Sequence, residues 1–226
     1  MTAGIPGVGE LDVDPEGMSF ADRAYLAIRD KLIMLDIRPG EAIVESELSA
    51  ELHFGRTPVR EALKRLEADR LVVSYPRRGT FATGVDVADL RHISQIRVNL
   101  EPVAARTAAE VASAATREQL AGMADDTQAL DVANVDRTEL MRWDLKVHRA
   151  IYRAAGNPHL EDVLVRYYNL ATRIYCLFLD RLPTVADHIE EHAMLLRAIA
   201  AGDADAAATI TLEHVMGFEK SVRAIV

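Results

Sequence analysis

The stretch Arg56-Thr-Pro-Val-Arg-Glu-Ala-Leu-Lys-Arg-Leu-Glu67 decides how the N-terminal third of the chain is interpreted. It predicts a helix over residues 57–69 with long basic side chains at its start. Pro58 falls in the first turn, where its missing N–H costs nothing. A recognition helix needs such donors near its N-terminus, because only long side chains reach base edges when the helix end enters the major groove. The stretch therefore indicates DNA binding.

The segments on either side of this helix complete a small domain. Upstream, Ser19 is placed to cap a helix that ends at Arg38-Pro-Gly40, and a second short helix begins at about Ser46. Residues 1–18 are rich in glycine, proline and acids and show no periodicity. We expect them to form a disordered tail.

Downstream of the arginine-rich helix, the sequence predicts a hairpin. Residues 71–75 and 80–83 are β-prone and flank Pro76-Arg-Arg-Gly79, which supplies turn residues and a basic tip. Three helices followed by such a hairpin predict a winged helix-turn-helix domain over residues 19–84.

The charge of the chain is unevenly distributed. The net charge is −9 at pH 7, which by itself argues against a nucleic-acid partner, because basic side chains supply much of that affinity. Within residues 56–78, however, there are seven bases and only three acids. The local charge is what a DNA groove meets, so the overall acidity does not exclude DNA binding.

The DNA contacts are expected from the third helix and from the tip of the hairpin. A guanidinium can bond guanine O6 and N7 with two donors at once, so an arginine at the helix start can read a G·C pair or hold a phosphate. The hairpin tip can reach the neighbouring minor groove or the backbone. The predicted DNA-binding residues are Arg56, Thr57, Arg60, Lys64, Arg77, Arg78 and Gly79. The alternative is an ordinary surface helix in which Lys64 pairs with Glu61 or Glu67.

From about residue 85 onward every segment is helix-like. Alanine is abundant and aromatic residues make up only 5% of the chain, which favours closely packed helices. A single cysteine allows no internal disulfide, and no apolar run approaches about 18 residues. We expect a mainly α, soluble, cytoplasmic protein whose second domain, residues 85–226, is an antiparallel helical bundle. Its six predicted helices are residues 87–114, 117–133, 137–155, 158–181, 184–201 and 204–224.

Three histidines and one acid in this second domain indicate a metal centre. Asp144 and His148 are four residues apart and share one helix face, while His192 and His214 lie in the last two predicted helices. Neutral imidazoles with one carboxylate suit zinc, nickel, manganese or iron(II), whereas calcium and magnesium prefer oxygen. We expect zinc, with the other three as alternatives. Taken singly, each histidine is more simply a core or surface residue, and His188, one turn before His192, could compete as a ligand.

The N-terminal region strongly resembles the GntR family of bacterial repressors, whose members carry a similar Arg-Thr-Pro-Val-Arg-Glu-Ala-Leu run and a basic Arg-Gly wing. The resemblance implies that Arg56 and Arg60 contact bases and that the wing enters the adjacent groove. Three residues depart from the family pattern. Gly55 stands where a Ser or Thr cap is usual, His53 where a turn glycine is common, and Ser46 where some members place an arginine that contacts DNA. These departures bear on the phosphate contacts at Ser46 and Gly55 and not on the fold.

The C-terminal half resembles the FadR-type ligand domain of that family, known as the FCD domain, and specifically its metal-binding subset. That subset has an Asp, a His four residues later and a His in each of the last two helices. The resemblance extends over residues 86–224 and implies a bundle of six or seven helices around a metal, with a small carboxylate effector completing the coordination. The residues that match the subset position by position are Asp144, His148, His192 and His214.

The same resemblance implies an arginine on the first bundle helix that pairs with the effector, and Arg97 occupies that place. A fork of N–H donors matches a carboxylate geometrically. The alternative for Arg97 is a pair with Glu101 on the same helix. Asn169 and Arg173, four residues apart on a later helix, are weaker candidates for the wall of the effector site.

Together these features predict a homodimeric, metal-containing transcription regulator that binds a palindromic double-stranded operator. We expect a repressor, because effector-induced release from DNA is the commoner behaviour in such a family. An effector would change operator affinity by the coupling free energy between sites, typically about 1–3 kcal/mol. Two alternatives stay open: a metal sensor in which the ion itself is the signal, and a metal-dependent enzyme. An enzyme is not expected, because no general base stands at a recognisable spacing and catalysis would not explain the arginine-rich helix. A membrane partner is not expected either.

Overall fold

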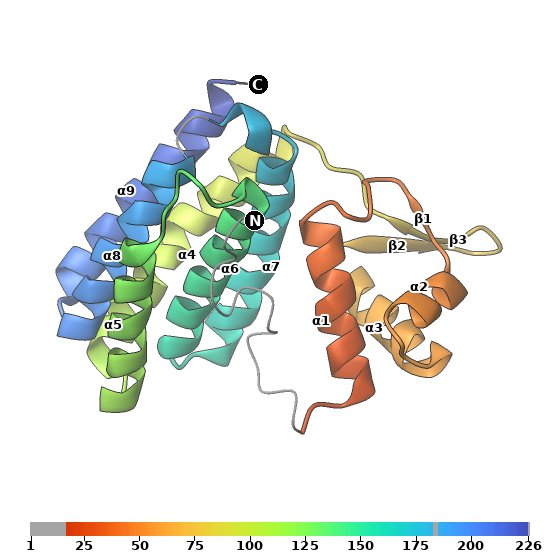
Figure 1. Cartoon of the computed structure of the whole chain (residues 1–226), viewed down its shortest axis with the longest axis horizontal. Coiled ribbons are helices and arrows are strands. Elements are labelled where there is room, and N and C mark those ends of the chain that lie inside the picture. Colours follow the sequence, from red (N-terminus) through yellow and green to blue (C-terminus); the bar gives the residue numbers. More distant parts are fainter. Residues whose placement is uncertain (1–16, 183–184, 226) are drawn as a thin grey trace. The chain divides into compact units, whose positions relative to one another are not determined.

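The computed structural model describes residues 17–182 and 185–225. These residues form nine α-helices, one short 3-10 helix and three short strands, which confirms the mainly α fold predicted from the sequence (Figure 1). The tail predicted for residues 1–18 lies outside the described residues except for Gly17 and Met18. The chain divides into two compact units, which are described separately.

The first unit contains residues 17–87 together with 172–177. Ser19 caps its first helix as predicted, because the Ser19 Oγ accepts from the backbone N–H of Asp22 at 3.1 Å. The first and third helices pack together through side chains such as Ile28 and Leu66, which are fully buried. The three helices of this unit are α1 (Phe20–Ile33), α2 (Glu45–Glu51) and α3 (Arg56–Ala68).

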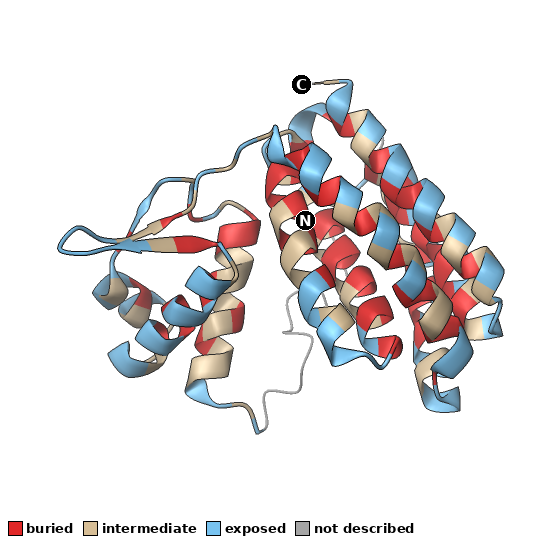
Figure 2. Ribbon diagram, turned by 180° about the vertical axis from the view of Figure 1, so that it is seen from behind, coloured by how far each residue is buried: buried red, intermediate tan, exposed pale blue. Residues whose placement is uncertain are grey.

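A three-stranded antiparallel sheet follows, with strand order β1-β3-β2. Its strands are β1 (Ala42–Ile43), β2 (Val72–Tyr75) and β3 (Gly79–Ala82). In the β2–β3 hairpin Tyr75 is opposite Gly79. The turn between them holds Arg77 at φ 63° and Gly79 at φ 96°, so the left-handed region is used on both sides of Arg78. The predicted hairpin is present, and its tip is exposed (Figure 2).

The second unit contains residues 88–171 and the described part of 178–225. The helix predicted over residues 158–181 is shorter than expected, because α7 ends at Cys176 and a 3-10 helix, η1 (Leu179–Arg181), follows. The bundle core is formed by α4 against α9, α5 against α8, and α6 against α4 and α8. Buried residues lie on the sides of these helices that face one another (Figure 2). The helices are α4 (Asp89–Val111), α5 (Ala114–Ala129), α6 (Arg137–Ala154), α7 (Pro158–Cys176, of which residues 172–176 are grouped with the first unit), α8 (Val185–Ala201) and α9 (Ala204–Arg223).

Small side chains and one arginine hold the ends of these helices close together. On α4 the alanines Ala104 and Ala108 are fully buried, and α4 packs most extensively against α9. The Arg117 guanidinium on α5 donates to the carbonyl of Ala109 at 2.5 Å and to that of Ile199 at 3.3 Å. It therefore supplies a donor to a carbonyl in the last turn of α4 and a further donor to that of Ile199 near the end of α8, which also accepts from the backbone N–H of Gly202 at 3.0 Å.

Among the described residues, no helix combines the length and apolar character needed to cross a membrane.

Candidate metal centre and DNA-binding surface

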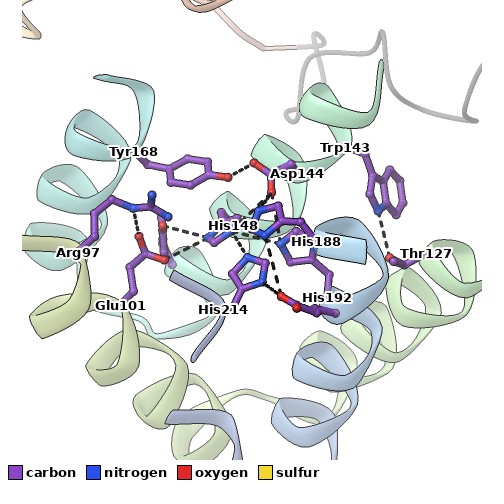
Figure 3. A network of polar contacts seen from close by, with 12 residues as sticks. Arg97, Glu101, Thr127, Trp143, Asp144, His148, Tyr168, His188, His192 and His214 are labelled. Carbon is purple, nitrogen blue, oxygen red and sulfur yellow. Dashed lines mark hydrogen bonds and ion pairs between the residues drawn. The ribbon is translucent and has the colours of Figure 1, made fainter. Parts of the chain in front are cut away.

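Three helices of the second unit bring five chelating side chains together. One ligand atom from each lies within 4.8 Å of all the others, and the five residues are 0–6% exposed. The four residues predicted from the sequence converge, and His188, considered only as a competitor, joins them (Figure 3). The five are Asp144 and His148 on α6, His188 and His192 on α8, and His214 on α9.

The ligand atoms are separated by distances that suit a shared ion. The Nε2 atom of His148 lies 3.2 Å from that of His192 and 3.3 Å from that of His214. Asp144 Oδ1 lies 3.2 Å from His188 Nε2 and 3.4 Å from His192 Nε2. Two atoms bonded to one ion at ~2.1 Å are ~3.0 Å apart at a right angle and ~3.4 Å apart at the tetrahedral angle. The observed separations fall within this range.

Neighbouring groups contact the outer ring nitrogens of two of these histidines. The Nδ1 of His148 lies 3.3 Å from Glu101 Oε2 and 3.2 Å from the Tyr152 hydroxyl, and the Nδ1 of His214 lies 2.8 Å from Glu191 Oε2. An ionised carboxylate only accepts hydrogen bonds, so the neutral His214 ring is assigned its proton on Nδ1 and its lone pair on Nε2. That lone pair faces His148 Nε2, 3.3 Å away, inside the protein. A cation between the two nitrogens would bind both, and histidine ligands of metals commonly carry such carboxylate partners.

The carboxylate of Asp144 is oriented on one side and lacks a hydrogen bond on the other. Its Oδ2 accepts a hydrogen bond from the hydroxyl of Tyr168, whereas Oδ1, which faces the histidines, has no hydrogen-bond partner. Burial alone would raise the pKa of Asp144, but the close contact with the His188 imidazole, followed by those with His148 and His192, brings it below its usual value. An ionised, buried oxygen without a donor is a ligand that a cation would satisfy.

His192 and His214 are in the protonation state that metals bind. Burial lowers the pKa of His192 and of His214 well below the usual value, so both rings are neutral at neutral pH. The pKa of His188 is also lowered, again mainly by burial. A nitrogen-rich set with one carboxylate fits a divalent transition metal and is a poor match to calcium or magnesium. The residues present could therefore hold a metal ion.

Arg97 lies beside this cluster and is engaged by its own helix. Its Nε donates to Glu101 Oε1, which is the alternative considered from the sequence, and the residue is 2% exposed. The guanidinium carbon lies 4.7 Å from the ring centroid of Tyr168, and Tyr168 in turn stacks on His148 with centroids 4.2 Å apart. Glu101 thus contacts both Arg97 and His148 (Figure 3).

The two weaker effector candidates have other partners. Asn169 is buried, and its Oδ1 accepts from the Arg149 guanidinium at 3.2 Å. Arg173 belongs to residues 172–177, which are grouped with the first unit, and there it donates to the hydroxyl of Thr83 at 2.6 Å. Neither residue is among those that could hold the ion.

The sequence pattern did not assign a role to Glu101, Tyr168 or Glu191. Glu101 had been considered only as a partner of Arg97, four residues away on the same helix. Glu191 directly precedes His192, and this position next to a predicted ligand was the one signal that could have found it. Tyr168 lies in an apolar stretch where nothing distinguishes it from a packing residue, so no sequence signal pointed to its contact with Asp144.

All seven predicted DNA-binding residues are exposed on the first unit. The Arg60 guanidinium forms an ion pair with Glu45, with Nη2 2.7 Å from Oε2. Its side chain remains 60% exposed, so this surface pair contributes little to stability. Glu67, proposed as an alternative partner of Lys64, instead accepts from the backbone N–H of Ser74 at 2.7 Å.

The turn before α3 explains two of the departures from the family pattern. His53 has φ 56°, a left-handed conformation in which glycine is less strained, and so the family's turn glycine has a physical reason. Gly55 is the N-cap of α3 and makes no side-chain hydrogen bond to the helix. The backbone N–H groups of the first turn are therefore left for another acceptor, such as a phosphate.

A winged helix-turn-helix with exposed arginines, joined in one chain to a helical bundle with a chelating cluster, defines a DNA-binding transcription regulator. The description "Bacterial regulatory proteins, gntR family" matches residues 20–82, and "FCD domain" matches residues 92–217. The chain belongs to this family of bacterial regulators and carries an FCD domain.

Individual relatives agree with this placement. An HTH-type transcriptional regulator in the TAR-I ttuE-ttuC' intergenic region of Agrobacterium vitis is 33% identical over 136 residues, which are 59% of this chain and 79% of that protein. The HTH-type transcriptional repressor GlaR of Escherichia coli K12 is 25% identical over 85% of this chain and 90% of its own length. The structure of E. coli McbR/YncC matches the fold with a TM-score of 0.79 at 20% identity, over 92% of this chain and 98% of that one. The chain is accordingly a transcription regulator and not an enzyme.

Proposed function

We propose that the chain is a ligand-responsive repressor whose signal is a small carboxylate metabolite bound at a metal ion in the helical unit. The ion would be held by Asp144, His148, His192 and His214. The observation that carries the proposal is a buried set of five ligand atoms within 4.8 Å of one another. In this set the Nε2 atoms of His148 and His214 lie 3.3 Å apart, beside an Asp144 oxygen that has no hydrogen-bond partner. We expect zinc, with nickel, manganese or iron(II) as alternatives. When bound, the ion supplies a positive charge that one carboxylate does not neutralise, and this charge attracts an anion.

The chain's own residues would orient the site and keep water out. Glu101 and Glu191 hold the rings of His148 and His214 through their Nδ1 atoms, and the Tyr168 hydroxyl holds Asp144. Such outer partners set the direction of each donor and raise its basicity. Because every donor is buried, an anion that reached the centre would meet little competition from solvent.

Arg97 is the proposed anchor for the effector carboxylate. Its guanidinium now pairs with Glu101, so an effector carboxylate would compete with Glu101 for the same donors. Glu101 also contacts His148. Displacing Glu101 from Arg97 would therefore alter a contact of a proposed metal ligand. Asn169 and Arg173 stay weaker candidates for the effector site.

On the DNA side, we propose that two copies of the chain bind a palindromic double-stranded operator. The start of α3 would enter the major groove, where Arg60 would exchange Glu45 for a base edge. The wing would contact the adjacent groove or backbone. The residues proposed for these contacts are Arg56, Thr57, Arg60, Lys64, Arg77, Arg78 and Gly79.

An operator-binding titration tests the proposal. Operator fragments would be selected from a random DNA pool with zinc-loaded protein, and binding would be followed by fluorescence anisotropy with acetate, glycolate, lactate, succinate and citrate. We expect at least one acid to weaken binding by about 5- to 150-fold, the usual range of coupling between sites. His148→Ala should bind the operator and lose this response. An acid that weakens DNA binding equally in wild type and in His148→Ala would place the effector elsewhere.

One observation favours a second candidate, a metal sensor in which the ion is the signal. The proposed donors are 0–6% exposed, and Arg97, the proposed effector anchor, is already paired with Glu101. A fully enclosed centre of this kind can respond to the ion without an organic ligand. Operator affinity that changes on removal of the metal by a chelator, and that no acid alters, would favour the sensor.

A further inference from the structure

His188 is placed in the cluster as firmly as the residues that the sequence predicted. It lies one turn before His192 on α8, and its Nε2 is 3.2 Å from Asp144 Oδ1. Its ring lies between two others: the His214 ring on one side, with centroids 3.9 Å apart and an interplanar angle of 11°, and the Phe218 ring on the other, 3.9 Å away at 19°. Two stacked neighbours restrict rotation of the ring. The nitrogen is therefore held facing Asp144 and the proposed ion position (Figure 3).

The spread of the five ligand atoms distinguishes a larger coordination shell from a tetrahedral one. A tetrahedral ion with bonds of ~2.1 Å has all of its ligand atoms ~3.4 Å apart, whereas a shell of five or six also contains opposite pairs separated by ~4.2 Å. In the cluster, separations of 3.2 Å occur alongside one of 3.8 Å between Asp144 Oδ1 and His148 Nε2, which lies between the values for adjacent and opposite ligands. This mixture fits five donors around one ion better than four.

We infer that His188 is a fifth protein ligand, so that a six-coordinate ion in this centre keeps one open position and takes an effector through a single carboxylate oxygen. The inference rests on the metal centre proposed above and adds to it the class of ligand that the centre accepts. A set of four imidazoles and one carboxylate fills five of six positions, which leaves no adjacent pair for a chelating hydroxy acid. A zinc ion in this set would be held outside its usual tetrahedral geometry, whereas the alternatives nickel, manganese and iron(II) adopt six-coordination.

A competing explanation gives His188 a different role. With its proton on Nε2, the ring would donate a hydrogen bond to Asp144 Oδ1 and act only as a positioning residue. Both roles agree with the distance of 3.2 Å. They differ in the number of imidazoles bound to the ion, which is four if His188 is a ligand and three if it only orients Asp144.

X-ray absorption of the full-length protein loaded with cobalt(II) counts these imidazoles. The comparison uses wild type, His188→Phe, which keeps an aromatic ring between His214 and Phe218 but removes the donor, and His92→Ala, which alters an exposed histidine. We expect four imidazoles in wild type and in His92→Ala and three in His188→Phe. Cobalt affinity should fall more than about 100-fold in His188→Phe, because loss of an outer partner alone costs about 10- to 100-fold.

Acetate and glycolate titrations of the same proteins test the open position. In wild type the two acids should bind cobalt-loaded protein within about 3-fold of each other, since each offers one oxygen to one position. In His188→Phe the second position opens, and glycolate, which chelates, should gain at least about 10-fold over acetate.

Three imidazoles in wild-type protein would overturn the inference while leaving the metal centre in place, and this result does not depend on the variant folding. An unchanged imidazole count in a folded His188→Phe protein would overturn it equally. Failure of wild type to bind cobalt, nickel, iron(II) or zinc would overturn the proposed metal centre itself, and the inference with it.

Discussion

Replacing Glu101 with glutamine should weaken both the fold and the proposed metal centre, because one buried carboxylate serves two partners. Glu101 is 1% exposed, accepts from Arg97 Nε and lies 3.3 Å from His148 Nδ1. Burial alone would raise the pKa of Glu101, yet the charge of Arg97 and the nearby His148 imidazole lower it to about 2. The group is therefore ionised at neutral pH, and Glu101→Gln removes a buried negative charge at almost constant volume.

The magnitude follows from what the variant leaves behind. Removing one partner of a buried ion pair costs about 3–5 kcal/mol, because the other charge stays buried without compensation. Glutamine still offers Arg97 one neutral acceptor, so we expect the lower end, about 3 kcal/mol. For a chain of this size that corresponds to a fall in Tm of roughly 6–12 °C. Metal affinity should fall about 10- to 100-fold, because His148 loses the carboxylate beside its Nδ1.

The assay separates the two effects. Urea denaturation of metal-free wild type and Glu101→Gln gives the change in the free energy of unfolding, and zinc titration of the same proteins gives the change in affinity. Glu190→Gln, an exposed position on α8, is the matched control and should change neither quantity measurably. If Glu101→Gln were as stable as the control and bound zinc with wild-type affinity, the claim that Glu101 joins Arg97 to the metal centre would be refuted.

The remaining predictions concern DNA binding and one helix end. Arg60→Ala should lose about 1–3 kcal/mol of operator binding and relax the base preference, and equal losses on operator and random DNA would refute its base-reading role. Arg77→Ala should weaken binding uniformly across sequences and reduce the salt slope by about 1; an unchanged slope in salt titrations would argue against a phosphate contact. Gly202→Ala should destabilise the fold by about 1–2 kcal/mol, because Gly202 has φ +79° and an added Cβ would lie 2.7 Å from Arg117 Nη1. Gly122→Ala, in α5 with open space around it, should instead stabilise the fold by about 0.5–1 kcal/mol. Thermal melts in which the Tm of both variants changed in the same direction would contradict the argument.

Local signals in the sequence were sufficient to predict most of the helices and the hairpin. Ser19 and Pro58 marked helix starts that depend only on backbone hydrogen bonding within a few residues. The strand β1 escaped prediction, because Ala42 and Ile43 are too few to show an alternating pattern and pair only with a segment far along the chain. The early end of α7 at Cys176 was also missed, since the apolar pattern continues through Leu179.

The candidate centre was only partly predictable, because it depends on how separate helices pack together. Spacing places Asp144 and His148 on one face of one helix, but it says nothing about how α6, α8 and α9 are rotated against one another. The match to the FCD pattern supplied the pairing of helices for four residues. His188 has no place in that pattern, and its membership depends on packing against Phe218, which only the three-dimensional structure gives.

The metal content of protein purified without added metal tests the central claim most directly. Native mass spectrometry with elemental analysis should find one divalent transition-metal ion per chain in wild type and in His159→Ala, an exposed histidine on α7. His148→Ala should contain far less. Equal metal content in wild type and His148→Ala, or wild-type protein that binds no divalent transition metal even when it is supplied, would contradict the account.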